Sequence, residues 1–196
     1  MLSHGKRVQQ MLDLARDASQ VSVGFSQQRA GFTMTRYLIG KGHTRIGFIG
    51  AQLDERTLKR AEGYRQAMRE AGLYDGRYEV MVAAPSTIDL GAILLDEMLA
   101  RVPGCEAIFC CNDDLAHGAI FQCQRRGIHV PQQLAICGFN DLPASAWMTP
   151  SVTTISTPRY QIGFEGATLL RALIQGEKPA QTQIDLRFTL LARASA

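Results

Sequence analysis

Short apolar runs alternate with longer amphipathic segments along most of this sequence. Runs rich in Ile, Phe, Val and Cys predict buried strands, and apolar residues spaced three and four apart predict helices. The predicted strands cover residues 45–50, 78–84, 106–111, 134–139, 152–157 and 184–193, and the predicted helices cover residues 27–41, 57–72, 86–101, 113–127 and 159–175. This alternation predicts a Rossmann-like α/β fold, with a parallel sheet covered by helices on both faces.

Caps and glycines set the expected helix ends. Glycines that can adopt the left-handed conformation follow several of the helices, at Gly42, Gly72, Gly127 and Gly176. Ser86 or Thr87 is the expected cap of the helix that follows it. In the helix over residues 57–72, the expected buried face comprises Leu58, Ala61, Tyr64, Ala67, Met68 and Ala71.

The loops that follow the strands form the predicted ligand-binding region. Right-handed crossovers between parallel strands place every strand-to-helix loop on one edge of the sheet. In open α/β sheets, ligands bind outside the carboxyl ends of the strands. The candidate loops therefore follow Ile49, Ala83, Cys111 and Phe139.

Composition excludes several classes of protein. The 196 residues are 46% hydrophobic and 20% charged, as in soluble globular proteins, and no apolar run approaches the roughly 20 residues that span a membrane. The net charge is only +3 and the 21 basic residues are spread out, which disfavours direct nucleic-acid binding by this segment. The five cysteines form no CxxC pair, and no signal peptide opens the sequence. We therefore expect a cytoplasmic protein without membrane contact.

The stretch FCCNDDLAHGAI, residues 109–120, holds two cysteines, two aspartates, an asparagine and a histidine close together. As a metal site it lacks the required spacing. Cys110 and Cys111 are adjacent, so they point to opposite faces of a strand, and no His or Cys at the right spacing joins His117. No metal ligand is predicted, and the cysteines are interpreted as small buried apolar residues.

The same stretch makes sense as a strand followed by a helix. Asn112 or Asp113 can cap the helix, and Asp114 in the first turn suits the helix dipole. A ligand role for Asn112 or Asp114 stays open. Motifs of nucleophilic, metalloprotease and nucleotide-binding sites are absent from the sequence, so no catalytic residue and no cofactor are predicted.

Arg56 and Arg60 follow the strand at 45–50 and share one face if their segment is helical. They form either an ordinary solvated face or a guanidinium pair that recognises a carboxylate or phosphate. The pattern alone favours neither. Trp147, in the loop after the strand at 134–139, is either a packing anchor or an exposed contact for a partner.

Five stretches occur together in the order and spacing of one known family. They are AGFTMTRYLIGKGHTRIGFIG, RAEGYRQAMREAG, AIFCCNDDLAHGAI, GIHVPQQLAICGFND and MTPSVTTISTPRYQIGFEGATLLRALIQGE. Over nearly the whole chain they resemble the effector-binding core of LacI/GalR-type transcription regulators. The stretches GAQLDERTLKRAEGY and RFTLLAR are most similar to the gluconate-operon repressor branch.

The resemblance implies a type I periplasmic-binding-protein-like core, with two α/β subdomains and a small effector in the cleft between them. It also implies a hinge near Phe25, Thr157 and Pro179, and a homodimer whose N-terminal helix-turn-helix domains bind operator DNA. The implied parts are residues 1–25 (remnant of the N-terminal subdomain), 26–156 (C-terminal subdomain), 157–177 (a helix returning to the N-terminal subdomain) and 178–196 (closing strand of the C-terminal subdomain). The helix-turn-helix domain is absent, so the chain is expected to be truncated at its N-terminal side.

Three arginines match effector positions of the family. Arg60, three residues before the glycine of RAEGY, matches the arginine that holds the effector, and Arg56 matches a second contact in that loop. Arg159 stands where some members have a stacking aromatic residue. Asn140 stands where aspartate is common, a loss of negative charge that suits an anion. The resemblance therefore implies a sugar acid rather than a neutral sugar.

Three further polar residues also match the family's contacts. Asn112 and Asp114 match polar contacts after a core strand, which leaves Asp113 as the expected helix cap. Asp13 matches an acidic contact of the N-terminal subdomain.

We therefore expect the effector-binding domain of a LacI-type repressor of carbohydrate uptake or catabolism genes, with gluconate or a phosphorylated relative as its effector. Effector binding would change the angle between the subdomains and, through it, operator affinity. Two alternatives stay open. One is a periplasmic-type sugar-binding protein, which should carry a signal peptide. The other is a sugar- or nucleotide-modifying enzyme on the same fold, which needs a nucleophile or base in the cleft.

Overall fold

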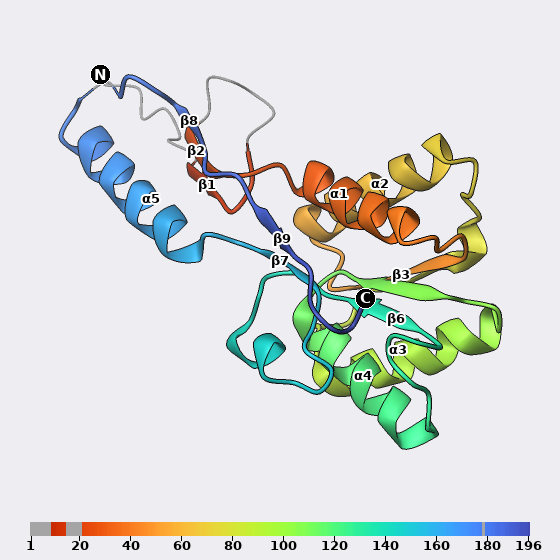
Figure 1. Ribbon diagram of the computed structural model, residues 1–196. Coiled ribbons are helices and arrows are strands. Elements are labelled where there is room, and N and C mark those ends of the chain that lie inside the picture. Colours follow the sequence, from red (N-terminus) through yellow and green to blue (C-terminus); the bar gives the residue numbers. More distant parts are fainter. Residues whose placement is uncertain (1–8, 15–20, 178) are drawn as a thin grey trace. The chain divides into compact units, whose positions relative to one another are not determined.

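The computed structural model describes residues 9–14, 21–177 and 179–196 (Figure 1). The chain forms two compact units. Unit 1 comprises Met1–Ser26 and Thr157–Phe188, and unit 2 comprises Gln27–Ser156 and Thr189–Ala196. Each unit is an α/β structure with its own sheet.

Unit 2 is built on a four-stranded parallel sheet with the strand order β4-β3-β5-β6. The strands are β3 (Ile46–Ala51), β4 (Glu79–Val82), β5 (Ala107–Cys110) and β6 (Ala135–Cys137). The helices are α1 (Gln27–Gly40), α2 (Glu55–Glu70), α3 (Ile88–Arg101) and α4 (Asp113–Arg126). Helices α1 and α2 cover one face of the sheet, and α3 and α4 cover the other (Figure 1). The predicted parallel sheet between two helical layers is confirmed.

The central strands β3 and β5 are buried along their whole length, which explains their unbroken apolar runs. The Phe48 ring packs edge-on against Phe109 of the neighbouring strand, with 5.3 Å between the ring centroids. Tyr64 of α2 packs on Phe48 from the helical layer, and its hydroxyl donates to the Ile46 carbonyl at 2.7 Å. This core fixes α2 against the sheet.

Helix α2 begins two residues before its predicted start, at Glu55, because the Asp54 carboxylate caps it by accepting from the Thr57 N–H at 2.8 Å. Four of the six residues predicted on the buried face are buried, namely Ala61, Tyr64, Ala67 and Met68. Leu58, expected in the core, is exposed, whereas Thr57 and Arg60 are buried.

Helices α1 and α2 approach each other closely at two glycines. A Cβ atom at Gly31 would clash with the backbone carbonyl of Arg60, and one at Gly63 would clash with the carbonyl of Gln28. The two helix backbones can therefore touch only because both positions lack a side chain. This close packing brings the start of α1 next to Arg60.

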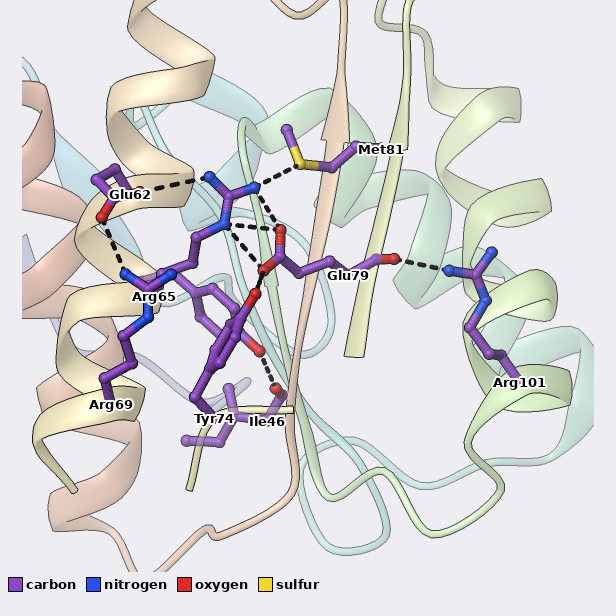
Figure 2. A network of polar contacts seen from close by, with 9 residues as sticks. Ile46, Glu62, Arg65, Arg69, Tyr74, Glu79, Met81 and Arg101 are labelled. Atoms are coloured by element: carbon purple, nitrogen blue, oxygen red, sulfur yellow. Dashed lines mark hydrogen bonds and ion pairs between the residues drawn. The ribbon is translucent and has the colours of Figure 1, made fainter. Parts of the chain in front are cut away.

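A polar network joins α2, β4 and α3 at the amino-terminal end of β4 (Figure 2). The Glu79 carboxylate accepts from the Arg65 guanidinium at 2.6 and 3.0 Å and from the Tyr74 hydroxyl at 2.9 Å. The Glu79 carbonyl accepts from Arg101 of α3 at 2.8 Å. Glu62 extends the network by pairing with Arg65 and Arg69. The network lies at the end of the sheet opposite to the predicted ligand-binding loops.

The described residues of unit 1 form a three-stranded parallel sheet and one long helix. The sheet order is β1-β2-β8, with β1 at Gln9–Met11, β2 at Val21–Gly24 and β8 at Gln183–Asp185, and the helix α5 spans Arg159–Ile174. Strands β1 and β2 were not predicted from the sequence. The predicted helix at 159–175 is confirmed, and Gly176 follows it with φ +81°.

The C-terminal segment forms two strands, so the prediction of one strand over residues 184–193 is wrong. Strand β8 belongs to the sheet of unit 1, whereas β9 (Thr189–Leu191) pairs antiparallel with β7 (Thr154–Ser156) in unit 2. Arg187, between them, adopts the left-handed conformation with φ +60°. The chain crosses from unit 1 to unit 2 after Phe188, and Pro179, a predicted hinge residue, lies within unit 1.

Candidate ligand-binding site

Hydrogen bonds connect the carboxyl ends of the four strands in unit 2, and the Cys111 N–H after β5 donates to the Ile49 carbonyl of β3 at 2.8 Å. The Gln52 N–H in the loop after β3 donates to the Ala84 carbonyl in the loop after β4, at 2.8 Å. The Asp113 N–H after β5 donates to the Phe139 carbonyl after β6, at 3.0 Å. The predicted ligand-binding loops therefore lie together, as the parallel topology requires.

Arg60 of α2 places a buried cation at this edge, with only 7% of its surface exposed. Its Nε donates to the Gln27 side-chain oxygen at 2.7 Å, and its Nη1 donates to the Cys111 carbonyl at 2.6 Å. The guanidinium also lies over the Phe139 ring, 3.7 Å from the ring centroid. Contacts from α1, from the end of β5 and from the loop after β6 thus fix both the position and the plane of the guanidinium.

Burial rules out the interpretation of Arg60 as part of a solvated charged face. Gln27 and Phe139, two of its partners, were missed as site residues. Gln27 is 33 residues away in sequence and was recognised only as a helix start. Phe139 was recognised only as the end of a strand. No local pattern in the sequence links either residue to Arg60.

Arg56 differs from Arg60 in its surroundings. Its side chain is about one-third exposed and pairs with Asp54, with 2.7 Å between Nη2 and Oδ2. Burial alone would raise the pKa of the Asp54 carboxyl, but the hydrogen bonds from Thr57 and Arg56 bring that pKa below its ordinary value. The cap of α2 and the Arg56 guanidinium are therefore held by one ionised carboxylate.

Asn112 caps α4, so the prediction of Asp113 as the cap is wrong. The Asn112 Oδ1 accepts from the Leu115 N–H at 3.1 Å, and its side chain also bonds to the Ser86 hydroxyl at 2.7 Å. Asp114, the other predicted contact, is partly buried, and within the described part of the chain its carboxylate has no hydrogen-bond or ion-pair partner. Both side chains lie at the edge where the loops meet.

Asn140 lies in a loop with unusual backbone geometry. It has φ +110°, and Asp141 after it has φ +54°. Gln52 and Leu53, in the loop after β3, also have positive φ. Such conformations are costly for residues other than glycine and cluster at binding sites. Hydrogen bonding from the Asn140 N–H to the Ile155 carbonyl at 2.9 Å helps to hold this loop.

Asp13 and Arg159, the remaining predicted contacts, belong to unit 1. Asp13 is buried, and its Oδ1 accepts from the Leu14 N–H at 2.9 Å. Arg159 is the exposed first residue of α5, and it lines an open depression of about 490 Å³ together with Thr157, Pro158, Tyr160 and Gln161.

The cysteines and His117, the other chemically active side chains considered in the sequence, are buried. All five cysteines are buried free thiols, and burial raises the pKa of Cys105 and Cys123 to about 11. Among the described residues, no group of His, Cys, Asp and Glu side chains is placed to hold a metal ion. His117 is buried and bonds to Ser145, with 2.9 Å between Nε2 and Oγ.

Trp147 is 88% exposed, which favours the partner-contact interpretation over that of a packing anchor. In the described part of the chain, no helix is both long and apolar enough to cross a membrane.

Comparison with known proteins gives a consistent result. The profile of the periplasmic binding protein-like domain family matches residues 35–196. The HTH-type transcriptional regulator GntR of Pseudomonas aeruginosa is 45% identical over 185 residues, which cover 94% of this chain and 54% of that protein. GntR of Escherichia coli is 40% identical over 95% of this chain and 56% of its own length. The chain thus spans about half the length of these curated relatives.

A solved structure agrees with the sequence relatives. The transcription regulator GntR from Chromobacterium violaceum superimposes with a TM-score of 0.93 at 51% identity, covering 96% of this chain and 69% of that one. A LacI family transcriptional regulator from Silicibacter pomeroyi gives a TM-score of 0.86 at 29% identity, over 95% of this chain and 68% of that one. These relatives are named as regulators, not as enzymes or as transport proteins.

Proposed function

Because the chain belongs to the periplasmic binding protein-like domain family, in the form found in LacI-type transcription regulators, we propose that it is the effector-binding part of a repressor that responds to a sugar acid. The observation that carries this proposal is the buried guanidinium of Arg60, held in one orientation at the carboxyl edge of the sheet. A planar cation with fixed orientation suits a carboxylate or phosphate, which it can bind through two parallel hydrogen bonds.

The neighbouring groups suit the rest of a sugar acid. Asn140 presents an amide rather than a carboxylate, so it adds no negative charge that would repel an anion. Asn112 and Asp114 supply oxygen and nitrogen atoms for the sugar hydroxyls, and Arg56 supplies a second cation at the rim. Asp13 and Arg159 would complete the contacts from unit 1. Gluconate or a phosphorylated relative is the effector that we propose, in line with the resemblance to the gluconate-operon repressor branch.

The proposed mechanism is allosteric. Effector binding favours one arrangement of the two subdomains, and a homodimer transmits this arrangement to helix-turn-helix domains of the kind that the relatives' names indicate. Effector and operator affinities would then be coupled by about 1–3 kcal/mol, typical of such systems. The exposed Trp147 and Phe121 of unit 2 are suited to the dimer contact. The five free thiols support a reducing compartment, the cytoplasm.

Calorimetric titration of the full-length protein with gluconate and 6-phosphogluconate tests the effector class. We expect saturable heat with at least one of them and none with the neutral sugar glucose. Operator-bound protein should then change its DNA affinity when the same ligand is added. Absence of heat with both acids would refute the sugar-acid proposal.

A further inference from the structure

Asp113 is a fully buried carboxylate that lies between two proposed ligand contacts, Asn112 and Asp114. With none of its surface exposed, it has no access to a ligand. Its Oδ2 accepts from the Leu142 N–H at 2.6 Å and from the Ser145 hydroxyl at 2.9 Å, and its Oδ1 accepts from the Thr154 hydroxyl at 2.7 Å. The start of α4 is therefore joined to the segment that follows β6 and to strand β7.

The surroundings of Asp113 leave little freedom. A Cβ atom on Gly138 would clash with the Asp113 carboxylate, so the chain passes directly over it at the end of β6. Ser145 donates its only hydroxyl proton to Asp113, so it must accept from the Nε2–H of His117. This chain of hydrogen bonds holds the carboxylate in one rotamer.

The segment that Asp113 holds is the one with unfavourable backbone geometry. Asn140 and Asp141 both have positive φ, a conformation that non-glycine residues keep only when the surrounding contacts impose it. Asp113 holds the chain on both sides of this pair. Its carboxylate accepts from the Leu142 N–H directly after the pair, and its own N–H donates to the Phe139 carbonyl directly before it. An ion pair of 2.7 Å between Asp141 and Arg193 supports the loop from the β9 side.

We propose that Asp113 is a positioning residue of the effector site. It fixes the segment from Phe139 to Leu142, so that the Phe139 ring lies against the Arg60 guanidinium and Asn140 stays at the ligand edge. The expected effect of Asp113 on effector binding rests on the proposed function. Its expected effect on the loop rests on the geometry alone. Asp113→Asn is the informative change, because it keeps the volume but removes the charge and replaces one acceptor oxygen by an NH2 group, so the bonds from Leu142, Ser145 and Thr154 cannot all be kept.

The first measurement needs no ligand. Hydrogen exchange of the full-length protein, followed by mass spectrometry, should become at least about tenfold faster over residues 139–146 in the Asp113→Asn variant. Exchange over the core strand β3 should stay near that of the unaltered protein. Unchanged exchange over residues 139–146 would overturn the positioning role.

The second measurement is affinity for gluconate and 6-phosphogluconate, with Glu79→Gln as the matched control. Glu79 is also a carboxylate that accepts from several donors, but its network lies at the opposite end of the sheet (Figure 2). Both variants are compared at a temperature at which circular dichroism shows both to be folded. We expect affinity to fall by about tenfold or more in Asp113→Asn, equal to about 1.4 kcal/mol, and to be retained in Glu79→Gln.

The outcomes separate this proposal from the proposed function. Faster loop exchange with equal affinities in the two variants would overturn the role of Asp113 in binding. If the unaltered protein binds neither acid, the sugar-acid proposal fails, and the loop exchange alone then decides whether Asp113 positions the segment.

Discussion

Replacing Arg60 by methionine separates its proposed role in effector binding from its role in the fold. Methionine removes the charge and every donor, but it keeps an apolar side chain of similar length against the Phe139 ring. A charge-assisted hydrogen bond shielded from water contributes about 1.5–3 kcal/mol. Loss of a two-bond contact to the effector should therefore cost at least about 3 kcal/mol, on the order of a 100-fold loss in affinity.

The same change also affects stability, because Arg60 donates to Gln27 and to the Cys111 carbonyl. Leaving those two acceptors without a donor costs about 1–3 kcal/mol each, and relief from burying a charge offsets part of this. We expect a net loss of about 1–3 kcal/mol, within the 5–15 kcal/mol typical of a folded domain. The variant should thus stay folded while losing affinity for the proposed effector.

Urea unfolding followed by circular dichroism measures the stability change, and calorimetry with the sugar acid measures the affinity. Arg56→Met is the matched control, because Arg56 is partly exposed and its ion pair with Asp54 is of the kind that contributes about 0–1 kcal/mol. We expect a smaller loss of affinity in this variant. Unchanged affinity in a folded Arg60→Met variant would refute the role assigned to Arg60.

Three further predictions follow from the described contacts. Asn112→Ala should lower the free energy of unfolding by about 1 kcal/mol through loss of the α4 cap, and urea unfolding would contradict this if Asp114→Ala cost more. Burial lowers the pKa of His117 below its ordinary value of about 6.5, although the nearby carboxylates partly oppose this shift. As the pH falls, the unfolded chain therefore binds a proton at this residue before the folded chain does. Stability should therefore decrease as the pH is lowered through 6.5 toward the folded pKa, and the His117→Gln variant should show a shallower decrease in urea titrations at several pH values. Trp147→Ser should weaken a homodimer without changing the circular dichroism spectrum, and an unchanged sedimentation profile in analytical ultracentrifugation would contradict its place in the interface.

The sheet and helices of unit 2 could be predicted because short sequence patterns determine their strands and helix ends. Buried parallel strands need continuous apolar runs, and residues such as Thr87 and Gly127 mark helix ends with their own side-chain or backbone chemistry. The short strands β1 and β2 of unit 1 lack such a run. The break between β8 and β9 falls at Arg187. This residue adopts the left-handed conformation although it is not a glycine, so no residue type in the sequence signals the break.

The candidate site was only partly predictable. Arg60 was identified, but its support was not, because Gln27 and Phe139 reach it only through tertiary packing. Asn112 and Asp113 are both good caps, and the choice depends on where β5 ends. Asn112 is extended with φ −153° and therefore takes the cap, which leaves Asp113 to turn into the interior.

The glycine contact between α1 and α2 has a consequence for genetics. Any side chain at Gly31 would press on the backbone of Arg60 itself and displace the guanidinium from Gln27. A screen for regulators that no longer respond to their inducing or co-repressing metabolite should therefore yield substitutions at Gly31 and Gly63. Such variants would have the same phenotype as substitutions of residues that contact the metabolite, although neither glycine has a side chain that could contact it.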